Sequence, residues 1–200
     1  MKKIYLLRHA SSEGSGYIGS RSDVHLTPAG HTRARQLGMQ LSSLSFDLIY
    51  ASPLLRCRET LFPYLAQNPK SKVIFDKALQ ELDFGLFEGM TYTGIQQRYP
   101  KEQTVWQNDP IHIGPPEGES LAALHIRIHD FIRSSIEEVL AENILICAHG
   151  GSIRAMICEL LHLGPEHHWD FQVDRGNFVL IQIFQHDCSI MSSMNTPSLI

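Results

Sequence analysis

Short apolar runs recur along the chain, and most of them lack the alternation of apolar and polar positions that marks a half-exposed strand. An uninterrupted apolar run of this kind is typical of a strand that other elements cover on both faces. The pattern therefore predicts strands at residues 4–7, 46–52, 72–75, 143–149 and 177–184.

Helical patterns fill several of the intervals between these runs. The segment 27–44 opens with a Thr-Pro pair, an N-cap residue followed by proline in the first turn. The segment 119–142 carries apolar side chains at helical spacing, and the segment 151–164 ends in a Gly-Pro pair. Strands that alternate with helices predict an α/β fold, a three-layer sandwich in which helices flank a mostly parallel central sheet.

The composition is that of an ordinary folded domain, with 43% hydrophobic and 19% charged residues in a chain of 200. No change in composition divides the chain, so we expect a single domain over residues 1–200 whose last ten residues fray. The net charge of -4 does not favour a nucleic-acid partner. No run approaches the roughly 18 apolar residues that span a bilayer, and the first residues do not fit a signal peptide. We therefore expect a cytoplasmic protein without a membrane partner.

Cysteine and histidine spacing does not predict a metal site. The four cysteines are widely separated and form no C-x-x-C pair, which favours a reducing compartment, and Cys147 is expected to be a buried thiol. His125 and His129 lie four residues apart on a predicted helix, a spacing that zinc can use, but no third ligand is evident. We favour a pair of histidines on a helix face and predict no metal or other cofactor.

Charged side chains follow three of the predicted strands. Arg8 and His9 come directly after the first run, and His149 ends the fourth. Arg56 lies in the first turns of the helix expected after the second run. Ligands of such sheets collect at the carboxyl ends of the strands, where guanidinium groups and helix N-termini form a receptor for a tetrahedral dianion. Each charge-assisted hydrogen bond there contributes about 1.5–3 kcal/mol, and phosphate is the anion that arginine forks favour.

Five separated motifs follow one another in a fixed order: LLRHASS, SPLLRCRET, QELDFGLFEG, GPPEGESL and AHGGSIRAM. Together they resemble the histidine phosphatase superfamily, also called the phosphoglycerate mutase-like family, from Arg8 to about Phe184. One such motif alone is a weak signal, but agreement of all five in order and spacing is specific. The resemblance implies the α/β sandwich of that family and phosphoryl transfer through a phosphohistidine.

The resemblance also implies a role for each matching residue. His9 matches the nucleophile, and Glu81 matches the acid that protonates the leaving oxygen and then helps to activate water. A structural ion pair with Lys77 is the alternative for Glu81. Arg21 lies in a loop at the expected mouth of the site, where substrate binding and plain solvation both stay open. The clamp on the phosphate oxygens matches Arg8, Arg56 and His149, with further contacts implied for Ser12, Ser15 and the backbone of Gly150.

General chemistry agrees with these roles. A nucleophilic histidine must present one unprotonated nitrogen while an acceptor such as a backbone carbonyl orients its other N–H. A carboxylic acid beside a dianionic ester holds its proton more tightly than in water, which keeps Glu81 protonated for the leaving group. The arginines and His149 supply the positive charge that stabilises the transferred phosphoryl group, so the reaction needs no metal.

Two positions depart from the pattern of the family. Ala10 stands where the family usually has glycine, a change that matters only if the backbone needs a positive φ there. Ser15 stands where the family commonly has asparagine, and its side chain has a shorter reach toward phosphate. The resemblance therefore does not determine the phosphate contacts of this loop.

Within the superfamily, the stretches YIGSRSDVHLTPAG and HHWDFQVDRGNFVLIQI resemble the alpha-ribazole phosphatases, although the second is not expected to touch the phosphate. The expected function is a phosphomonoesterase that hydrolyses alpha-ribazole 5′-phosphate, a small phosphorylated substrate, in cobalamin biosynthesis. A broad sugar-phosphate or nucleotide phosphatase is the main alternative. A phosphoglycerate mutase is less favoured because the connection 86–116 offers little lid against water, and a non-catalytic phosphate-binding module has no use for Glu81. The sequence does not reveal the oligomeric state, and a homodimer is compatible with it.

Overall fold

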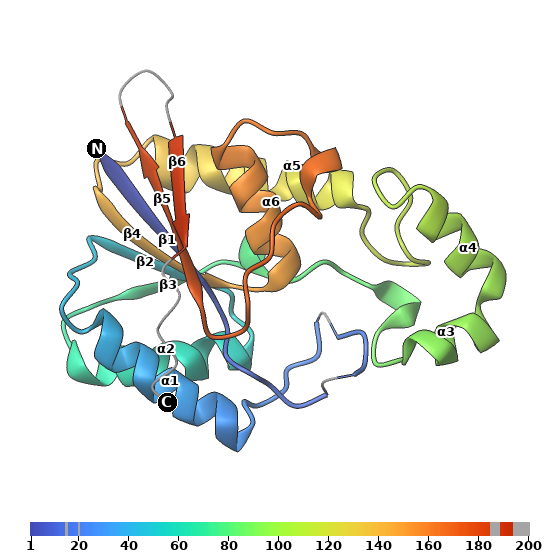
Figure 1. Cartoon of the computed structure of the whole chain (residues 1–200), viewed down its shortest axis with the longest axis horizontal. Coiled ribbons are helices and arrows are strands. Elements are labelled where there is room, and N and C mark those ends of the chain that lie inside the picture. The colour runs from blue at the N-terminus through green and yellow to red at the C-terminus, as the bar shows by residue number, and fades with distance from the viewer. Residues whose placement is uncertain (15, 20, 185–188, 194–200) are drawn as a thin grey trace.

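One sheet of six strands runs through the computed structural model, which describes residues 1–14, 16–19, 21–184 and 189–193 (Figure 1). The strand order is β3-β2-β4-β1-β5-β6. The pairs β3–β2, β2–β4 and β4–β1 are parallel, whereas β5 and β6 run antiparallel to their neighbours. The predicted mostly parallel sheet is confirmed. Its strands are β1 (Lys2–Arg8), β2 (Leu48–Ala51), β3 (Val73–Phe75), β4 (Asn143–Ala148), β5 (Phe178–Ile183) and β6 (Ser189–Ser193).

Helices cover both faces of the sheet, which confirms the three-layer sandwich (Figure 1). The side chains of β1 alternate between the layers: Ile4 and Leu6 pack in the cluster with α5 and α6, and Tyr5 and Leu7 pack in the cluster with α1 and α2. None of the described helices is both long and apolar enough to cross a bilayer. The helices are α1 (Pro28–Leu41), α2 (Leu55–Gln67), α3 (Tyr92–Arg98), α4 (Pro100–Asn108), α5 (Leu121–Ile132) and α6 (Gly150–Leu160).

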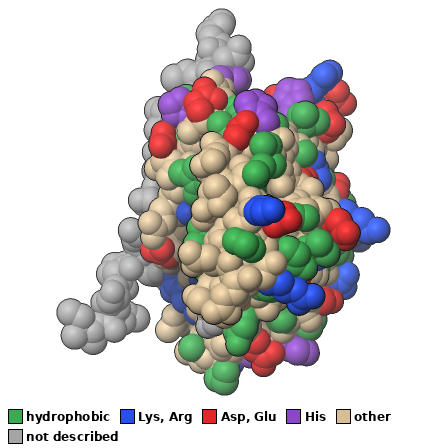
Figure 2. Space-filling model, turned by 90° about the vertical axis from the view of Figure 1, so that its right-hand side faces the viewer, with side chains coloured by type: hydrophobic (Ala, Val, Ile, Leu, Met, Phe, Trp, Pro, Cys, Tyr) green, Lys and Arg blue, Asp and Glu red, His purple; other side chains and the backbone are tan. Residues whose placement is uncertain are grey.

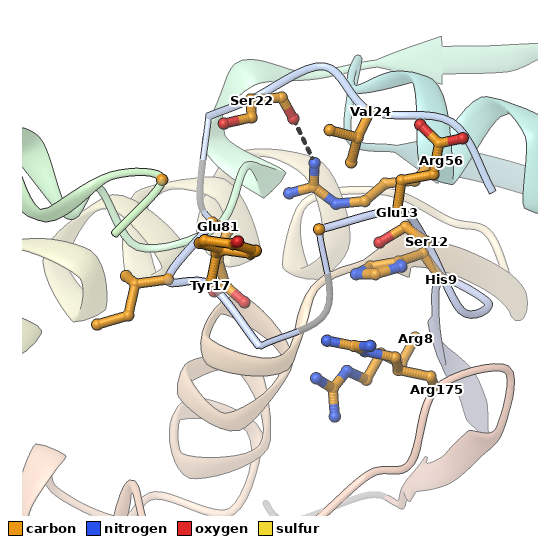
Figure 3. A pocket seen from close by; sticks show the side chains of 14 residues that line it. Arg8, His9, Ser12, Glu13, Tyr17, Ser22, Val24, Arg56, Glu81 and Arg175 are labelled. Atoms are coloured by element: carbon orange, nitrogen blue, oxygen red, sulfur yellow. Dashed lines mark hydrogen bonds between the residues drawn. The ribbon is translucent and has the colours of Figure 1, made fainter. Parts of the chain in front are cut away.

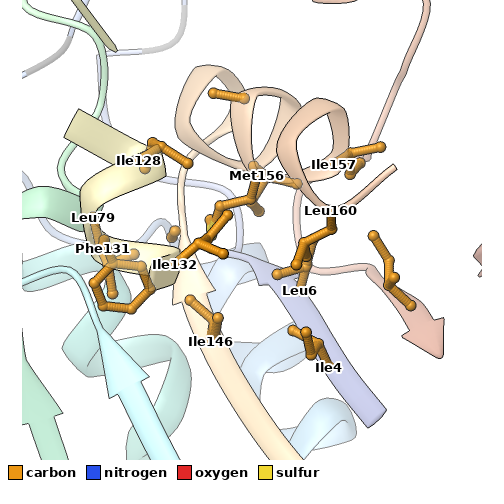
Figure 4. Close-up of a cluster of buried hydrophobic side chains, with 14 of the residues drawn as sticks. Ile4, Leu6, Leu79, Ile128, Phe131, Ile132, Ile146, Met156, Ile157 and Leu160 are labelled. Atoms are coloured by element: carbon orange, nitrogen blue, oxygen red, sulfur yellow. The ribbon is translucent and has the colours of Figure 1, made fainter. Parts of the chain in front are cut away.

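The largest of the three hydrophobic clusters among the described residues lies between the sheet, α5 and α6. Full burial of one large aliphatic side chain stabilises the fold by about 1.5–3 kcal/mol. This cluster therefore holds the carboxyl ends of β1 and β4 against the start of α6. Figure 4 labels several of its fully buried members, among them Ile4, Leu6, Ile128, Ile146 and Met156.

Two predicted helices end earlier than the apolar pattern indicates. The segment 119–142 is α-helical only to Ile132 and continues as a π-helical turn to Glu137. The chain then enters β4, and the carboxylate of Asp47 accepts hydrogen bonds from the backbone N–H groups of residues 142 and 143 at 3.0 and 2.8 Å where that strand begins. The segment 151–164 stops being helical at Leu160, since His162 takes a left-handed conformation with φ of 57°.

Three elements are absent from the sequence-based prediction. The connection 86–116 contains α3 and α4, which are held by aromatic contacts of Phe87 with Tyr99 and Trp106. β6 pairs with β5 at the sheet edge. Of the tail expected to fray, residues 191–193 belong to β6 and the rest lies outside the described residues.

Candidate active site

A cavity of about 360 Å³ lies at the carboxyl ends of the parallel strands (Figure 3). Its charged lining comes from widely separated elements that the fold brings together. β1 ends in Arg8 and leads into His9, α2 supplies Arg56 from its first turn, and Glu81 follows η1 (Lys77–Leu79). The convergence at one edge of the sheet that the sequence predicts for Arg8, His9, Arg56 and His149 is observed around this cavity for the first three, and Glu81 joins them there.

His9 is buried and held in one tautomer. Its Nδ1 lies 2.7 Å from the carbonyl oxygen of Ala10, and because a carbonyl only accepts, Nδ1 carries the proton and donates. Nε2 of the neutral ring is then unprotonated. Burial, followed by the positive charge of Arg56, lowers the pKa of His9 to about 3, so the neutral form dominates near neutral pH. The ring thus has the state that nucleophilic attack requires.

Arg8 lies against the first turn of α6. Its Nη1 donates to the carbonyl oxygen of Val173 at 2.8 Å, and its buried Nε has no hydrogen-bond partner among the residues that the structure describes. A Cβ at Gly150 would lie 3.1 Å from the Arg8 guanidinium carbon, so a side chain there would push the guanidinium back by a few tenths of an ångström. The predicted contact between the Gly150 backbone and phosphate stays a prediction.

Arg56 lines the cavity and forms a buried pair with His149, which lies behind it. Nε of Arg56 donates to Nδ1 of His149 at 3.2 Å, which leaves the ring proton of His149 on Nε2, 2.8 Å from the hydroxyl oxygen of Ser52. His149 is fully buried and does not line the cavity, although its ring centroid lies 5.1 Å from that of His9. Burial, then the charge of Arg56, lowers the pKa of His149 and keeps it neutral. His149 is therefore placed to orient Arg56, and the direct contact with phosphate implied for it stays a prediction.

Glu81 lies at the N-terminus of α6. Its carboxylate accepts from the backbone N–H of Gly151 at 2.9 and 3.1 Å and from that of Ser152 at 3.2 Å. These backbone bonds, and not an ion pair with Lys77, hold the side chain. A Cβ at Gly151 would lie only 2.4 Å from Oε1 of Glu81, so the second glycine of the His-Gly-Gly run makes room for the carboxylate.

The three remaining residues that were predicted to contact the substrate have different positions. Ser12 is buried and lines the cavity. Arg21 does not line it; its Nη1 donates to Gln80 at 2.9 Å, and its Nε lies 3.7 Å from a carboxylate oxygen of Asp83. Ser15 lies outside the described residues.

Ala10 fits where the family has glycine. In the part of the chain that the structure describes, only Glu117 and His162 combine a side chain with a positive φ, so the backbone of Ala10 does not need glycine. Its methyl group is buried in a small cluster with Leu26 and Ala34. This departure from the family pattern therefore leaves the His9 loop intact.

A sequence model of the histidine phosphatase superfamily (branch 1) matches residues 4–196. The chain belongs to the histidine phosphatase superfamily. This confirms the resemblance carried by the five motifs.

Proteins that resemble the chain have names that refer to different substrates. The putative phosphoserine phosphatase 2 of Hydrogenobacter thermophilus is 30% identical over 92% of this chain and 90% of that protein. The 2,3-bisphosphoglycerate-dependent phosphoglycerate mutase of Brucella anthropi is 33% identical over 82% of this chain and 84% of that protein. The crystal structure of the alpha-ribazole phosphatase from Shigella flexneri matches with a TM-score of 0.90 at 28% identity and covers 97% and 96% of the two chains. These likenesses identify the superfamily but not one substrate.

Arg175 is a lining residue that the sequence does not predict. It lies in the stretch 167–183, which was not expected to touch the phosphate, and its side chain lines the same cavity as Arg8 and His9. The cause is the antiparallel pairing of β5 with β1, which brings the start of β5 to the carboxyl end of β1. The rule that ligands collect at the carboxyl ends of parallel strands does not predict a site residue that precedes an antiparallel strand.

Histidines elsewhere in this superfamily member serve other contacts. His125 Nε2 lies 3.2 Å from Nδ1 of His168, both rings being buried, whereas His129 Nδ1 lies 3.1 Å from Glu159. His125 and His129 thus face different partners. Across residues 1–14, 16–19, 21–184 and 189–193, no group of three or more His, Cys, Asp or Glu side chains is arranged to hold a metal ion.

Proposed function

We propose that this protein hydrolyses phosphate monoesters through a phosphohistidine formed on Nε2 of His9. One observation carries the proposal: a buried histidine lines the cavity with Nδ1 bound to the Ala10 carbonyl and Nε2 unprotonated. A solvated surface histidine would have neither a fixed tautomer nor a strongly lowered pKa.

The first step of the proposed reaction forms a bond between Nε2 of His9 and phosphorus and breaks the bond between phosphorus and the ester oxygen. Glu81 gives its proton to that oxygen, and the alcohol leaves. In the second step a water molecule attacks phosphorus, Glu81 takes a proton from it, and the bond to His9 breaks to release phosphate. General acid–base help of this kind contributes about 10²–10⁴-fold in rate.

Arg8 and Arg56 stabilise the charge of the phosphoryl oxygens in both steps. Their guanidinium groups lie on opposite sides of the His9 ring in Figure 3, so each can contact a different oxygen of a phosphoryl group at His9. His149 and Ser52 fix Arg56 from behind. The guanidinium groups supply the positive charge, so the proposed reaction uses no cofactor.

Alpha-ribazole 5′-phosphate is the substrate we propose. The likeness to the Shigella flexneri structure supports it, as do the apolar side chains of Tyr17, Ile18 and Val24 in the cavity lining, which suit the aromatic base of a nucleoside leaving group. Exposed apolar side chains such as Leu86 and Tyr92 lie at the end of the molecule formed by α3 and α4, where Figure 2 shows hydrophobic side chains among charged ones.

We place this activity in the cytoplasm, in one domain over residues 1–200. The buried free thiols of Cys57, Cys147 and Cys158 agree with a reducing compartment.

A broad-specificity phosphatase is the second candidate, and the likeness to a phosphoserine phosphatase at 30% identity favours it. A mutase is less favoured because no residue of α3 or α4 lines the cavity, so these helices do not keep water from a phosphohistidine. The Brucella anthropi relative nevertheless makes phosphoglycerate a necessary test substrate.

The test is a comparison of kcat/KM for alpha-ribazole 5′-phosphate, phosphoserine, 3-phosphoglycerate and p-nitrophenyl phosphate, all in EDTA. We expect hydrolysis of all four, with alpha-ribazole 5′-phosphate preferred by at least about tenfold, which corresponds to about 1.4 kcal/mol of differential binding in the transition state. Equal values would support the broad-specificity candidate. Absence of any hydrolysis would favour a phosphate-binding module.

A further inference from the structure

Three guanidinium groups line the cavity, and only two of them belong to the motifs that identify the superfamily. Arg8 and Arg56 belong to those motifs, and Arg175 is the third. Figure 3 shows the guanidinium groups of Arg175 and Arg8 next to each other on one side of the His9 ring, with Arg56 on the other side. The position of Arg175 therefore calls for a function in this cavity.

The backbone that carries Arg175 is fixed to the end of β1. The N–H of Gly176 donates to the carbonyl oxygens of Arg8 and His9 at 3.1 and 3.0 Å, and the N–H of Arg8 donates to the carbonyl oxygen of Asn177 at 3.0 Å. These hydrogen bonds therefore join the backbone of Arg8 and His9 to the turn that carries Arg175. A shift of Arg175 relative to the proposed nucleophile would break them.

Arg33 of α1 holds the other side of this turn. Its Nε donates to the carbonyl oxygen of Gly176 at 2.8 Å, and its Nη2 donates to the side-chain oxygen of Asn177 at 2.7 Å. Gly176 has φ of +70°, and a Cβ there would lie 2.6 Å from Cγ of Arg33. Hydrogen bonds on both sides therefore fix the position of the turn, and Arg175 is its residue that lines the cavity.

The charge of Arg175 is not balanced by a neighbouring carboxylate. Within the described ranges, no acidic oxygen lies within 4.0 Å of a nitrogen of its guanidinium, and the adjacent Asp174 instead accepts a hydrogen bond from Gln172 at 2.9 Å. Arg175 and Arg8 repel each other, and both lower the pKa of His9. Like charges at one site are stabilised when an anion binds between them.

We propose that Arg175 binds the phosphoryl group that is transferred to His9, alongside Arg8. The inference rests on the proposed function, because it names a further group that binds the same substrate. A phosphoryl group in transfer spreads charge over three equatorial oxygens. Nη1 of Arg8 is engaged by Val173, and both ring nitrogens of His149 are engaged by Arg56 and Ser52. Arg175 adds a guanidinium with five N–H donors on the solvent side of the cavity.

The experiment compares the wild type with Arg175→Gln, which keeps a polar side chain but shortens it and removes the charge. Arg175→Lys restores charge without the fork, and Arg35→Gln removes a charge from the exposed face of α1 as a matched control. Turnover of p-nitrophenyl phosphate and of phosphoserine is measured for each variant. The dissociation constant of inorganic phosphate, measured by titration calorimetry, and the Tm are measured on the same samples.

We expect Arg175→Gln to lower kcat/KM by roughly 10- to 100-fold for both esters and to weaken phosphate binding about tenfold or more, without a fall in Tm. Arg175→Lys should recover part of both losses, and Arg35→Gln should match the wild type. The inference is overturned if Arg175→Gln binds phosphate as tightly as the wild type. It is also overturned if the loss of turnover is confined to one ester, because the contact would then be to the leaving group.

Failure of the proposed function gives a different pattern. A wild type that hydrolyses neither ester refutes the phosphatase. The calorimetric comparison still decides whether Arg175 binds phosphate, since it requires no turnover.

Discussion

Gly151→Ala tests the position of Glu81 without touching the carboxylate itself. The added methyl group would lie 2.4 Å from Oε1 of Glu81, and ordinary contact begins at about 3.4 Å. The carboxylate must therefore move by about 1 Å, which breaks its hydrogen bonds to the N–H groups of Gly151 and Ser152 at 2.9 and 3.2 Å. The atom that must yield is the end of a flexible side chain, so the backbone can stay in place.

A displacement of about 1 Å at a catalytic group costs about 100-fold in rate. We therefore expect kcat for phosphoserine to fall about 100-fold in Gly151→Ala. The loss should be smaller for p-nitrophenyl phosphate, whose acidic phenol leaves with little help from a proton donor. The higher helix propensity of alanine, about 1 kcal/mol over glycine in a helix interior, should offset part of the stability that is lost with these hydrogen bonds.

The matched control is Gly94→Ala in the first turn of α3, where the nearest atom is Oγ1 of Thr91 at 3.2 Å. Steady-state kinetics on both esters and thermal unfolding are measured for the two variants. The reasoning is refuted if Gly151→Ala hydrolyses phosphoserine within about twofold of the wild type, or if both esters lose the same factor. Either result would mean that Glu81 does not protonate the leaving oxygen.

Two further predictions concern buried histidines. The pKa values of His9 and His168 are lowered to about 3, in both cases mainly by burial, so the unfolded chain binds more protons below the ordinary value of 6.5. The free energy of unfolding should therefore fall as the pH drops from about 6.5, by about 1.4 kcal/mol per pH unit for each such histidine. Urea titrations measure this free energy, and a pH-independent value down to about pH 5 would contradict the prediction. Ser52→Ala removes the hydroxyl that accepts a hydrogen bond from Nε2 of His149 at 2.8 Å. It should destabilise the fold by about 1–3 kcal/mol and lower kcat, whereas Ser52→Thr keeps the hydroxyl and serves as the control. An unchanged Tm in Ser52→Ala would argue against the bond.

The main part of the site could be predicted from the sequence because it follows apolar parallel strands. Arg8, His9 and His149 each come at the end of a run that could be read as a strand, and the carboxyl ends of such strands meet at one edge. Glu81 has no such signal, and the resemblance to the superfamily identified it. Its contact with the start of α6 depends on the two glycines after His149, which leave room for two charged side chains.

The parts that could not be predicted depend on tertiary contacts. Arg175 reaches the cavity only because β5 runs antiparallel to β1, and no local pattern specifies that direction. The start of β4 is held by Asp47, which is far away in the sequence. The burial of His149 behind Arg56 could also be recognised only in the folded structure, since the motif alone suggests a ring that faces the substrate.

The most direct test of the mechanism is rapid acid-free quenching of the enzyme during turnover of a phosphate ester that carries radiolabel on phosphorus. Digestion and mass spectrometry then locate the label. An acid-labile phosphoryl group on the peptide that contains His9, absent from a folded His9→Ala variant that has also lost turnover, is the predicted result. Turnover without any labelled enzyme, or turnover that survives in His9→Ala, would contradict it.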